Sequence, residues 1–268
     1  MAITTLDGVI SGMRPPEEIF KIGVTMQSAG IWHSTFYQNG RPGAAAAPTV
    51  SVTGAALSTY AGQVPWSDPV SGNTYLARFE ASPQNAGAAM LADRLWHNAG
   101  LTVTVLTSQS VNSAAFPARD RDGSTNGENV LVAMEVTGTL GNAAGITNCT
   151  MVYTNSAGTG SRTATLAIIP TTAQAGTFLP FALQAGDTGV RSVQTIALNT
   201  SLVSGSISLV AYRQVAMVPC PQENVGAAVD AISSGFPRLY NGSVLFVCWL
   251  PSVTAPTNLS GQVIVTQG

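Results

Sequence analysis

The sequence predicts a mainly β protein, an antiparallel β-sandwich or jelly roll with one covering α-helix. Between Cys149 and Arg213, five short apolar runs are separated by clusters of Gly, Asn, Ser, Asp and Pro, a spacing typical of antiparallel sandwiches and barrels. In several runs the apolar residues alternate, as at Ile207, Leu209 and Ala211. Alternation offers one face of each strand to a core.

Before this stretch, the sequence predicts an N-terminal arm over residues 1–30. Pro15 and Pro16 interrupt any helix there, so the arm either crosses a neighbouring surface or leads into the first strand. The β domain then covers residues 31–268, and a weak subdivision near residue 140 is left open. Aromatic residues favour a strand over 31–37, and T-Y-L-A-R-F-E-A predicts another strand over 74–81.

The covering helix is expected at residues 84–98. Ser82 stands where an N-cap would lie, Pro83 occupies the first helical position, and Gly100 follows the last turn. Apolar residues at helical spacing form a stripe that can lie on a sheet. The polar residues of this segment, Asp93, Arg94 and Asn98, are expected to face outward or to cap.

Strands are expected to resume after the helix. Alternating residues predict strands over 101–111 and 130–138, on either side of a polar loop over 112–129. Residues 218–235 are expected to form a loop with one or two helical turns. Two last strands close the chain, of which S-V-L-F-V-C-W-L-P is apolar on both sides and therefore central.

The low charge content is the most informative number. Only 9% of the 268 residues are Asp, Glu, Lys or Arg, whereas about a quarter is usual. A freely diffusing domain generally keeps a charged surface of mixed sign. We therefore expect much of the exterior to be covered by copies of the same chain or by a larger assembly.

Composition also argues against several partners. The net charge is −2 and Lys21 is the one lysine, so the clustered basic residues that phosphate contacts need are missing. The first residues lack the pattern of a signal peptide, and no run approaches 18 apolar residues. We therefore expect no nucleic-acid partner and no membrane. We expect Cys149, Cys220 and Cys248 to be buried, reduced thiols. A disulfide between two of them is the alternative.

Candidates for catalysis are few, and we expect neither an enzyme nor a cofactor. The two histidines, His33 and His97, are read as packed, capping or interface residues. No metal-binding spacing of His and Cys occurs, and the serine-hydrolase motif G-x-S-x-G is absent. Sugar hydrolysis needs a pair of carboxylates that come together only in the folded chain, so sequence spacing does not exclude it. The glutamates lie in stretches typical of arms, loops and solvent faces, which argues against such a pair.

A candidate calcium loop lies at residues 118–129. Oxygen-bearing side chains alternate there, as ligands of a hard cation do: Asp120, Asp122, Ser124, Asn126 and Glu128. The pattern departs from a helix-loop-helix calcium site at two positions, since Thr125 replaces the glycine and Leu131 the last glutamate. We therefore favour a turn-rich loop whose arginines pair locally or across an interface.

Several residues are candidates for contacts with other subunits. The glycines of G-D-T-G-V-R-S-V-Q at 186–194 lack the order of a phosphate cradle and indicate a tight turn before a strand. The interface candidates are Arg14, Trp32, Arg119, Arg121 and Arg191.

Short phrases over most of the chain resemble virion structural proteins of tailed bacteriophages. They include G-N-T-Y-L-A-R-F, L-A-D-R-L-W-H-N-A-G-L, F-P-A-R-D-R-D-G-S-T-N-G and G-D-T-G-V-R-S-V-Q-T-I. The resemblance implies a copy-rich capsid or tail component of β-sandwich type, made in the host cytoplasm, with no functional residue to carry over.

We therefore expect a capsid-decorating or cement protein that binds the major capsid protein and its own copies, with a trimer suited to a three-fold site. The arm and the 112–129 loop would be the contact elements. One alternative is a structural role in the tail, baseplate or neck. A second is attachment to a host surface or glycan through Trp32, Trp66 and Tyr75, and an enzyme ranks third.

Overall fold

A computed structural model describes residue 3 and residues 5–268 of the chain, and it confirms the predicted mainly β, antiparallel fold. The α-helix of the described part, α1 (Leu6–Ser11), is six residues long, and a 3-10 turn, η1, covers Thr35–Tyr37. Nowhere in the described part does a helix have both the length and the apolar character needed to span a bilayer.

The chain forms two compact units that interleave along the sequence. The first comprises residues 1–46, 58–93 and 214–268, and the second residues 47–57 and 94–213. Two of the four boundaries fall inside strands, after Asp93 in β6 (Gly87–His97) and after Arg213 in β13 (Ser206–Cys220), and the other two lie outside the strands. Residue 140 lies within the second unit.

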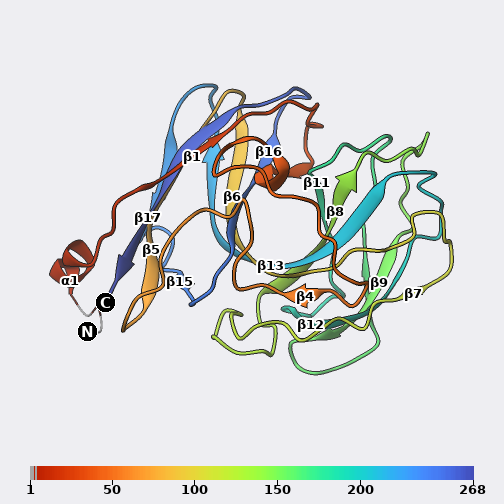
Figure 1. Cartoon of the computed structure of the whole chain (residues 1–268), viewed down its shortest axis with the longest axis horizontal. Helices are drawn as coiled ribbons and strands as arrows, with labels where there is room; N and C mark the ends of the chain where they lie inside the picture. Colours follow the sequence, from red (N-terminus) through yellow and green to blue (C-terminus); the bar gives the residue numbers. More distant parts are fainter. Residues whose placement is uncertain (1–2, 4) are drawn as a thin grey trace. The chain divides into compact units, whose positions relative to one another are not determined.

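The first unit contains a sheet with the order β14-β5-β17-β1-β3, in which β15 also pairs with β5. Its central strands β5, β17 and β1 lie side by side (Figure 1). The strand bounds are Glu17–Lys21 for β1, Gly40–Arg41 for β3, Thr74–Pro83 for β5, Ala227–Asp230 for β14, Arg238–Leu239 for β15 and Leu259–Gln267 for β17.

A second layer of this unit contains β2 (Trp32–Ser34), β16 (Leu245–Pro251) and the unit's parts of β6 and β13. One hydrophobic cluster joins residues of both layers, including Phe79 of β5, Val263 of β17 and Trp249 of β16. Each is at most 1% exposed. The two layers therefore enclose a single core, as in a β-sandwich.

The second unit is also built from antiparallel sheets. One has the order β10-β9-β12-β7, and in the other β8 lies between β13 and β11, while β4 pairs with the end of β6. The remaining bounds are Ala55–Ala56 for β4, Gln109–Ser110 for β7, Val130–Gly138 for β8, Thr150–Asn155 for β9, Arg162–Thr165 for β10, Thr177–Pro180 for β11 and Val190–Ala197 for β12.

The sequence periodicity explains these strands of the second unit. In β9, Met151, Tyr153 and Asn155 are buried while their neighbours are partly exposed, which is the alternation of a strand with one face on a core. β8 is different, because five successive residues from Val132 to Val136 are buried. Such continuous burial marks a central strand that is covered on both faces.

The predicted helix at residues 84–98 is wrong. This segment forms β6, which pairs with β16 from Leu245↔Asp93 to Pro251↔Gly87. Nine of its eleven residues are buried, so the apolar residues cover both faces and not the single stripe of a surface helix. Pairing between distant segments therefore overrides the helix propensity of Ala, Leu and Met here. Pro83 ends the preceding strand β5 and does not begin a helix.

Three shorter predictions also need correction. The expected strand over 101–111 is reduced to β7, because its first half is a turn in which Val105 N–H donates to the Thr102 carbonyl. The expected helical turns over 218–235 are replaced by the end of β13 and by β14. Only 32–34 of the expected strand 31–37 is extended, before η1. The three cysteines are free and buried, as predicted.

Candidate interaction surface

The fold removes a large share of the few charges from the surface. Seven of the 24 charged side chains are buried: Lys21, Asp93, Arg94, Arg119, Asp120, Glu135 and Arg213. Only 17 charged side chains are left for the exterior of a 268-residue chain. The surface is therefore even less charged than the composition indicates.

A buried ion pair organises the centre of the second unit. Arg94 Nη2 donates to Glu135 Oε2 at 2.7 Å, and neither side chain has any solvent exposure. Arg94 Nε also donates to His97 Nδ1 at 3.2 Å. Burial and the nearby positive charge of Arg94 lower the pKa of His97 to about 3. His97 is therefore neutral at physiological pH and serves as a structural acceptor.

The predicted outward positions of Asp93, Arg94 and Asn98 are wrong, since all three are completely buried. Asp93 lies in the first unit, where its carboxylate accepts hydrogen bonds from the Ser243 hydroxyl and the Val244 amide at 2.8 and 2.9 Å. Asn98 accepts one from the Leu209 amide at 2.7 Å. These polar side chains therefore form hydrogen bonds with backbone or side-chain groups inside the fold, as buried polar groups generally do.

The candidate calcium loop is organised around the carboxylate of Asp120. Its Oδ1 accepts hydrogen bonds from the amides of Asp122 and Ser124, and its Oδ2 accepts from the Ser124 hydroxyl and the amides of Gly127 and Glu128, all at 2.7–3.1 Å. Burial opposes ionisation of Asp120, but these hydrogen bonds outweigh it and lower its pKa. Both oxygens therefore hold the loop backbone.

The other candidate ligands of this loop face local partners. Asp122 and Glu128 pair with Arg121 at 3.0 and 3.5 Å, the Ser124 hydroxyl accepts from the Asn126 amide, and the Asn126 carbonyl accepts from Arg191. Among residues 3 and 5–268, no three His, Cys, Asp or Glu side chains lie together as a metal site would require. Arg121 therefore has the local pairing that we favoured from the sequence, whereas Arg119 donates to carbonyls outside the loop.

The interface candidates differ in their accessibility. Arg119 is 4% exposed and donates to the carbonyls of Leu57 and Arg94 at 2.6 and 3.1 Å, so its side chain offers no surface to a partner molecule. Arg14 is exposed and donates to the Gln267 side chain at 2.8 Å. Arg121 is also exposed, and Trp32 and Arg191 are partly so. These four remain candidates for contacts.

The remaining histidine and the one lysine lie inside the first unit. His33 Nε2 lies 3.4 Å from the Ser28 carbonyl oxygen, and burial lowers its pKa to about 4. Lys21 is 3% exposed, and its ammonium donates to the carbonyls of Gln38 and Pro42 at 3.3 and 2.8 Å. Burial lowers the pKa of Lys21 to about 8. Neither residue has a carboxylate partner of the kind that general acid-base chemistry would use.

Sequence reasoning missed a polar clamp in the second unit. Asp187 accepts hydrogen bonds from Tyr153 Oη at 2.5 Å, Arg162 Nε at 2.9 Å and Asn155 Nδ2 at 2.7 Å. The hydrogen bond from Arg162 is the main cause that lowers the pKa of Asp187 to about 2. The clamp fastens the turn before β12 to β9 and β10. Asp187 lies more than 20 residues from each partner, so no local motif could reveal it.

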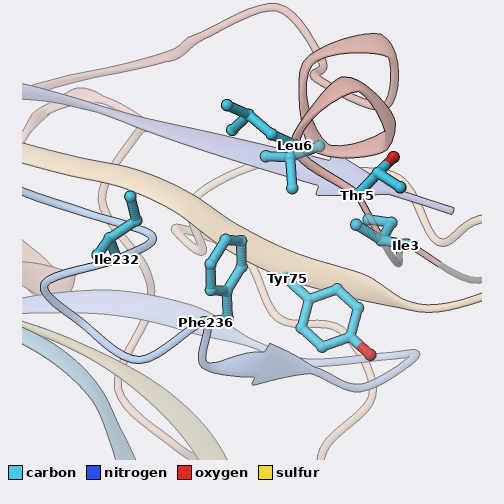
Figure 2. Close-up of a pocket in the computed structure, with 7 residues that line it drawn as sticks. Ile3, Thr5, Leu6, Tyr75, Ile232 and Phe236 are labelled. Atoms are coloured by element: carbon cyan, nitrogen blue, oxygen red, sulfur yellow. The ribbon is translucent and has the colours of Figure 1, made fainter.

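An apolar groove lies on the first unit between α1 and the turn after β14. It has a volume of about 430 Å³ and is lined by Ile3, Thr5, Leu6, Val9, Tyr75, Ile232 and Phe236. Figure 2 shows Leu6 and Ile3 on one side of the groove and Ile232 and Phe236 on the other, with Tyr75 beside them. None of these side chains is charged.

Exposed apolar side chains extend this surface. Leu6 is 67% exposed and Ile232 is 80% exposed, and Ile10 in α1 and Met13, two residues after α1, are 58% and 47% exposed. Apolar patches beside a groove mark interaction surfaces on soluble domains. We call the groove with these exposed residues the apolar groove surface, and it is the candidate functional site.

Comparisons with known proteins do not assign a family. No protein-family model matches the sequence, and no curated protein matches it. Among solved structures, the chain is similar to the infectious bursal disease virus Gt strain, with 12% identity, 76% of this chain and 47% of that chain covered, and a TM-score of 0.16. It thus spans about half of that chain.

A second similar structure is the infectious bursal disease virus VP2 subviral particle, with 8% identity, 96% of this chain and 82% of that chain covered, and a TM-score of 0.19.

Proposed function

We propose that this chain is a structural component of a virion, most specifically a capsid-decorating or cement protein of a tailed bacteriophage. The observation that carries the proposal is the burial of seven of the 24 charges, which leaves an extended and weakly charged exterior. Permanent assemblies cover such surfaces with neighbouring subunits. The short sequence phrases that resemble virion proteins of tailed bacteriophages support the assignment to a phage particle.

The partners in this proposal are the major capsid protein and further copies of the chain. Several exposed charges pair within the chain, as in Arg41 with Glu18 and Arg78 with Glu80, and such pairs contribute little long-range attraction. Binding would therefore depend on apolar contact area, for which the apolar groove surface is the best-formed element. Ring-shaped homo-oligomers, including a trimer, fit a symmetric shell.

The proposal includes no catalysis and no cofactor. The histidines are buried and neutral, and the buried carboxylates of Asp93, Asp120 and Glu135 are held by hydrogen bonds or an ion pair within the fold. A structural role in the tail, baseplate or neck is the alternative to decoration. For the attachment alternative, Trp66 is partly buried with its Nε1 donating to the Ser243 carbonyl, and Tyr75 lines the apolar groove.

A binding experiment with particles assembled without this chain tests the proposal. The purified chain should bind such particles, and Ile232→Glu should weaken this binding at least about tenfold, because a carboxylate would be desolvated in the contact. Val70→Glu is the matched control, since Val70 is fully exposed and lies outside the groove lining. Failure of the unmodified chain to bind, or equal weakening by both variants, would contradict the proposal.

A further inference from the structure

The first unit carries a second cleft, of different chemistry from the apolar groove. It has a volume of about 370 Å³ and is lined by Phe20, Ser82, Gln84, Asn224, Asn258 and Ser260. One aromatic ring, three carboxamides and two hydroxyls therefore face a common space, and no charged side chain lines it. Small-molecule sites of this size combine an apolar surface with a few placed polar groups.

Strand register places three of these residues in one row. Phe20 of β1 pairs with Ser260 of β17, and Ser260 pairs with Ser82 of β5. Directly paired residues project from the same face of a sheet, and Phe20 is 42% exposed on that face. The row forms a floor in which a half-exposed ring adjoins two hydroxyl groups. Gln84 immediately follows β5, and Asn258 immediately precedes β17. Both therefore lie beside this row, two positions along the chain from Ser82 and Ser260 respectively.

The carboxamides keep hydrogen-bonding capacity for a ligand. The side-chain carbonyl of Asn258 accepts from the backbone amide of Gly23 at 3.1 Å, and the side-chain carbonyl of Gln84 accepts from the backbone amide of Asn258 at 3.4 Å. These contacts use oxygens and leave both NH₂ groups as donors. Asn224 has a φ of 56° in an exposed turn, and its amide donates to the Pro83 carbonyl at 2.9 Å. This bond fixes the backbone that presents its carboxamide.

The charges on the neighbouring row of the same face are compensated. Glu18 lies two residues from Phe20 in β1 and pairs with Arg41 at 2.6 Å. Glu80 lies two residues from Ser82 in β5, where it pairs with Arg78 at 3.0 Å and accepts from Gln262 at 3.0 Å. An ionic ligand would therefore find no unpaired counter-charge from these groups.

We propose that this cleft binds a neutral saccharide unit. A sugar ring presents an apolar C–H face, which can pack on the exposed Phe20 ring, and a rim of hydroxyls that both donate and accept hydrogen bonds. Carboxamides and hydroxyls match that rim, since they also do both. The absence of charge in the lining selects an uncharged ligand. This role is independent of the structural role above and would give a virion component a contact with surface polysaccharide.

Ligand-observed NMR with a panel of neutral methyl glycosides, neutral oligosaccharides and acidic oligosaccharides tests the inference on the full chain. We expect saturation transfer to neutral sugars, and an affinity about tenfold lower in Phe20→Ala, equivalent to about 1.4 kcal/mol. Phe20→Tyr keeps the ring face and should retain binding. Val24→Ala, at a 67% exposed position of the same unit that does not line the cleft, is the matched control.

Thermal unfolding of each variant shows whether the fold is kept, and a second variant, Asn224→Ala, probes the rim without touching the core. Loss of sugar binding in Phe20→Ala and in Asn224→Ala, with binding kept in Phe20→Tyr and Val24→Ala, supports the proposal that the cleft binds a neutral saccharide. No transfer to any neutral sugar, transfer to acidic sugars only, or binding that survives both substitutions would overturn it. None of these outcomes bears on particle binding, so the two proposals fail separately.

Discussion

The buried ion pair between Arg94 and Glu135 makes a quantitative prediction about stability. Glu135→Leu removes the carboxylate from β8 and leaves the Arg94 guanidinium at a site without solvent exposure. At an effective dielectric constant of about 20, charge centres roughly 3–4 Å apart attract by about 4–6 kcal/mol. Because desolvation offsets part of this attraction, the expected loss in the free energy of unfolding is about 3–5 kcal/mol.

The double variant Arg94→Met with Glu135→Leu separates the charge effect from packing. With both charges gone, we expect most of the stability to return, to within about 1–2 kcal/mol of the unmodified chain. Glu135→Gln keeps an acceptor without the charge and should cost an intermediate amount. Glu223→Leu is the control, because Glu223 is exposed and its loss should change stability by less than about 0.5 kcal/mol.

Urea unfolding followed by tryptophan fluorescence measures these differences. Trp96 is buried in the same unit and contacts Phe116 with ring centroids 5.5 Å apart. Trp32, Trp66 and Trp249 belong to the first unit, so the fluorescence follows the unfolding of both units. A cost below about 1 kcal/mol for Glu135→Leu, or a double variant no more stable than the single one, would refute the reasoning.

Three further predictions concern other buried polar groups. His33 and His97 have folded pKa values of about 4 and 3, below the unfolded value of about 6.5, so stability should fall by several kcal/mol as pH drops from about 6.5 to 4. Lys21 has a folded pKa of about 8, below its unfolded value of about 10.5. Between these pH values the unfolded state binds the extra proton, so stability should rise across that window by roughly 2–3 kcal/mol. Asp120→Ala should cost about 2–3 kcal/mol, since five donors lose their acceptor, and added calcium should not shift the unfolding midpoint of the unmodified chain.

Matched variants provide the controls. Replacing both histidines with Gln should flatten the acid slope, and Lys21→Met should remove the alkaline rise that the unmodified chain shows relative to it. An unchanged slope in either case would contradict the assignment of the titrating group. A calcium-dependent rise in the unfolding midpoint that Asp120→Ala abolishes would show that the loop does hold a cation.

Alternation in the sequence predicts the strands well where one face meets a core. Residues 150–155 are an example, because each buried side chain there is followed by a partly exposed neighbour. The segment 87–97 fails for the opposite reason. Its residues are buried on both faces, and a run of Ala, Met and Leu without alternation looks the same in a helix and in a central strand.

The polar sites show a similar limit. The turn-forming residues of 118–129 predict a tight loop, but only the fold shows that Asp120 accepts five hydrogen bonds from it. Arg94 and Glu135 are 41 residues apart, and Phe20 meets Ser260 and Ser82 only through strand pairing. Contacts of such long range have no signature in a single sequence, so neither the buried pair nor the cleft could be predicted.

The most direct test of the structural role is the number of copies of the chain in purified virions, measured by quantitative mass spectrometry against the major capsid protein. Decoration of the shell predicts on the order of hundreds of copies per particle, in a fixed ratio to the capsid subunit. A count of about a dozen or fewer would move the chain to the tail, baseplate or neck. Particles that contain none of it, from cells that produce it, would contradict the account.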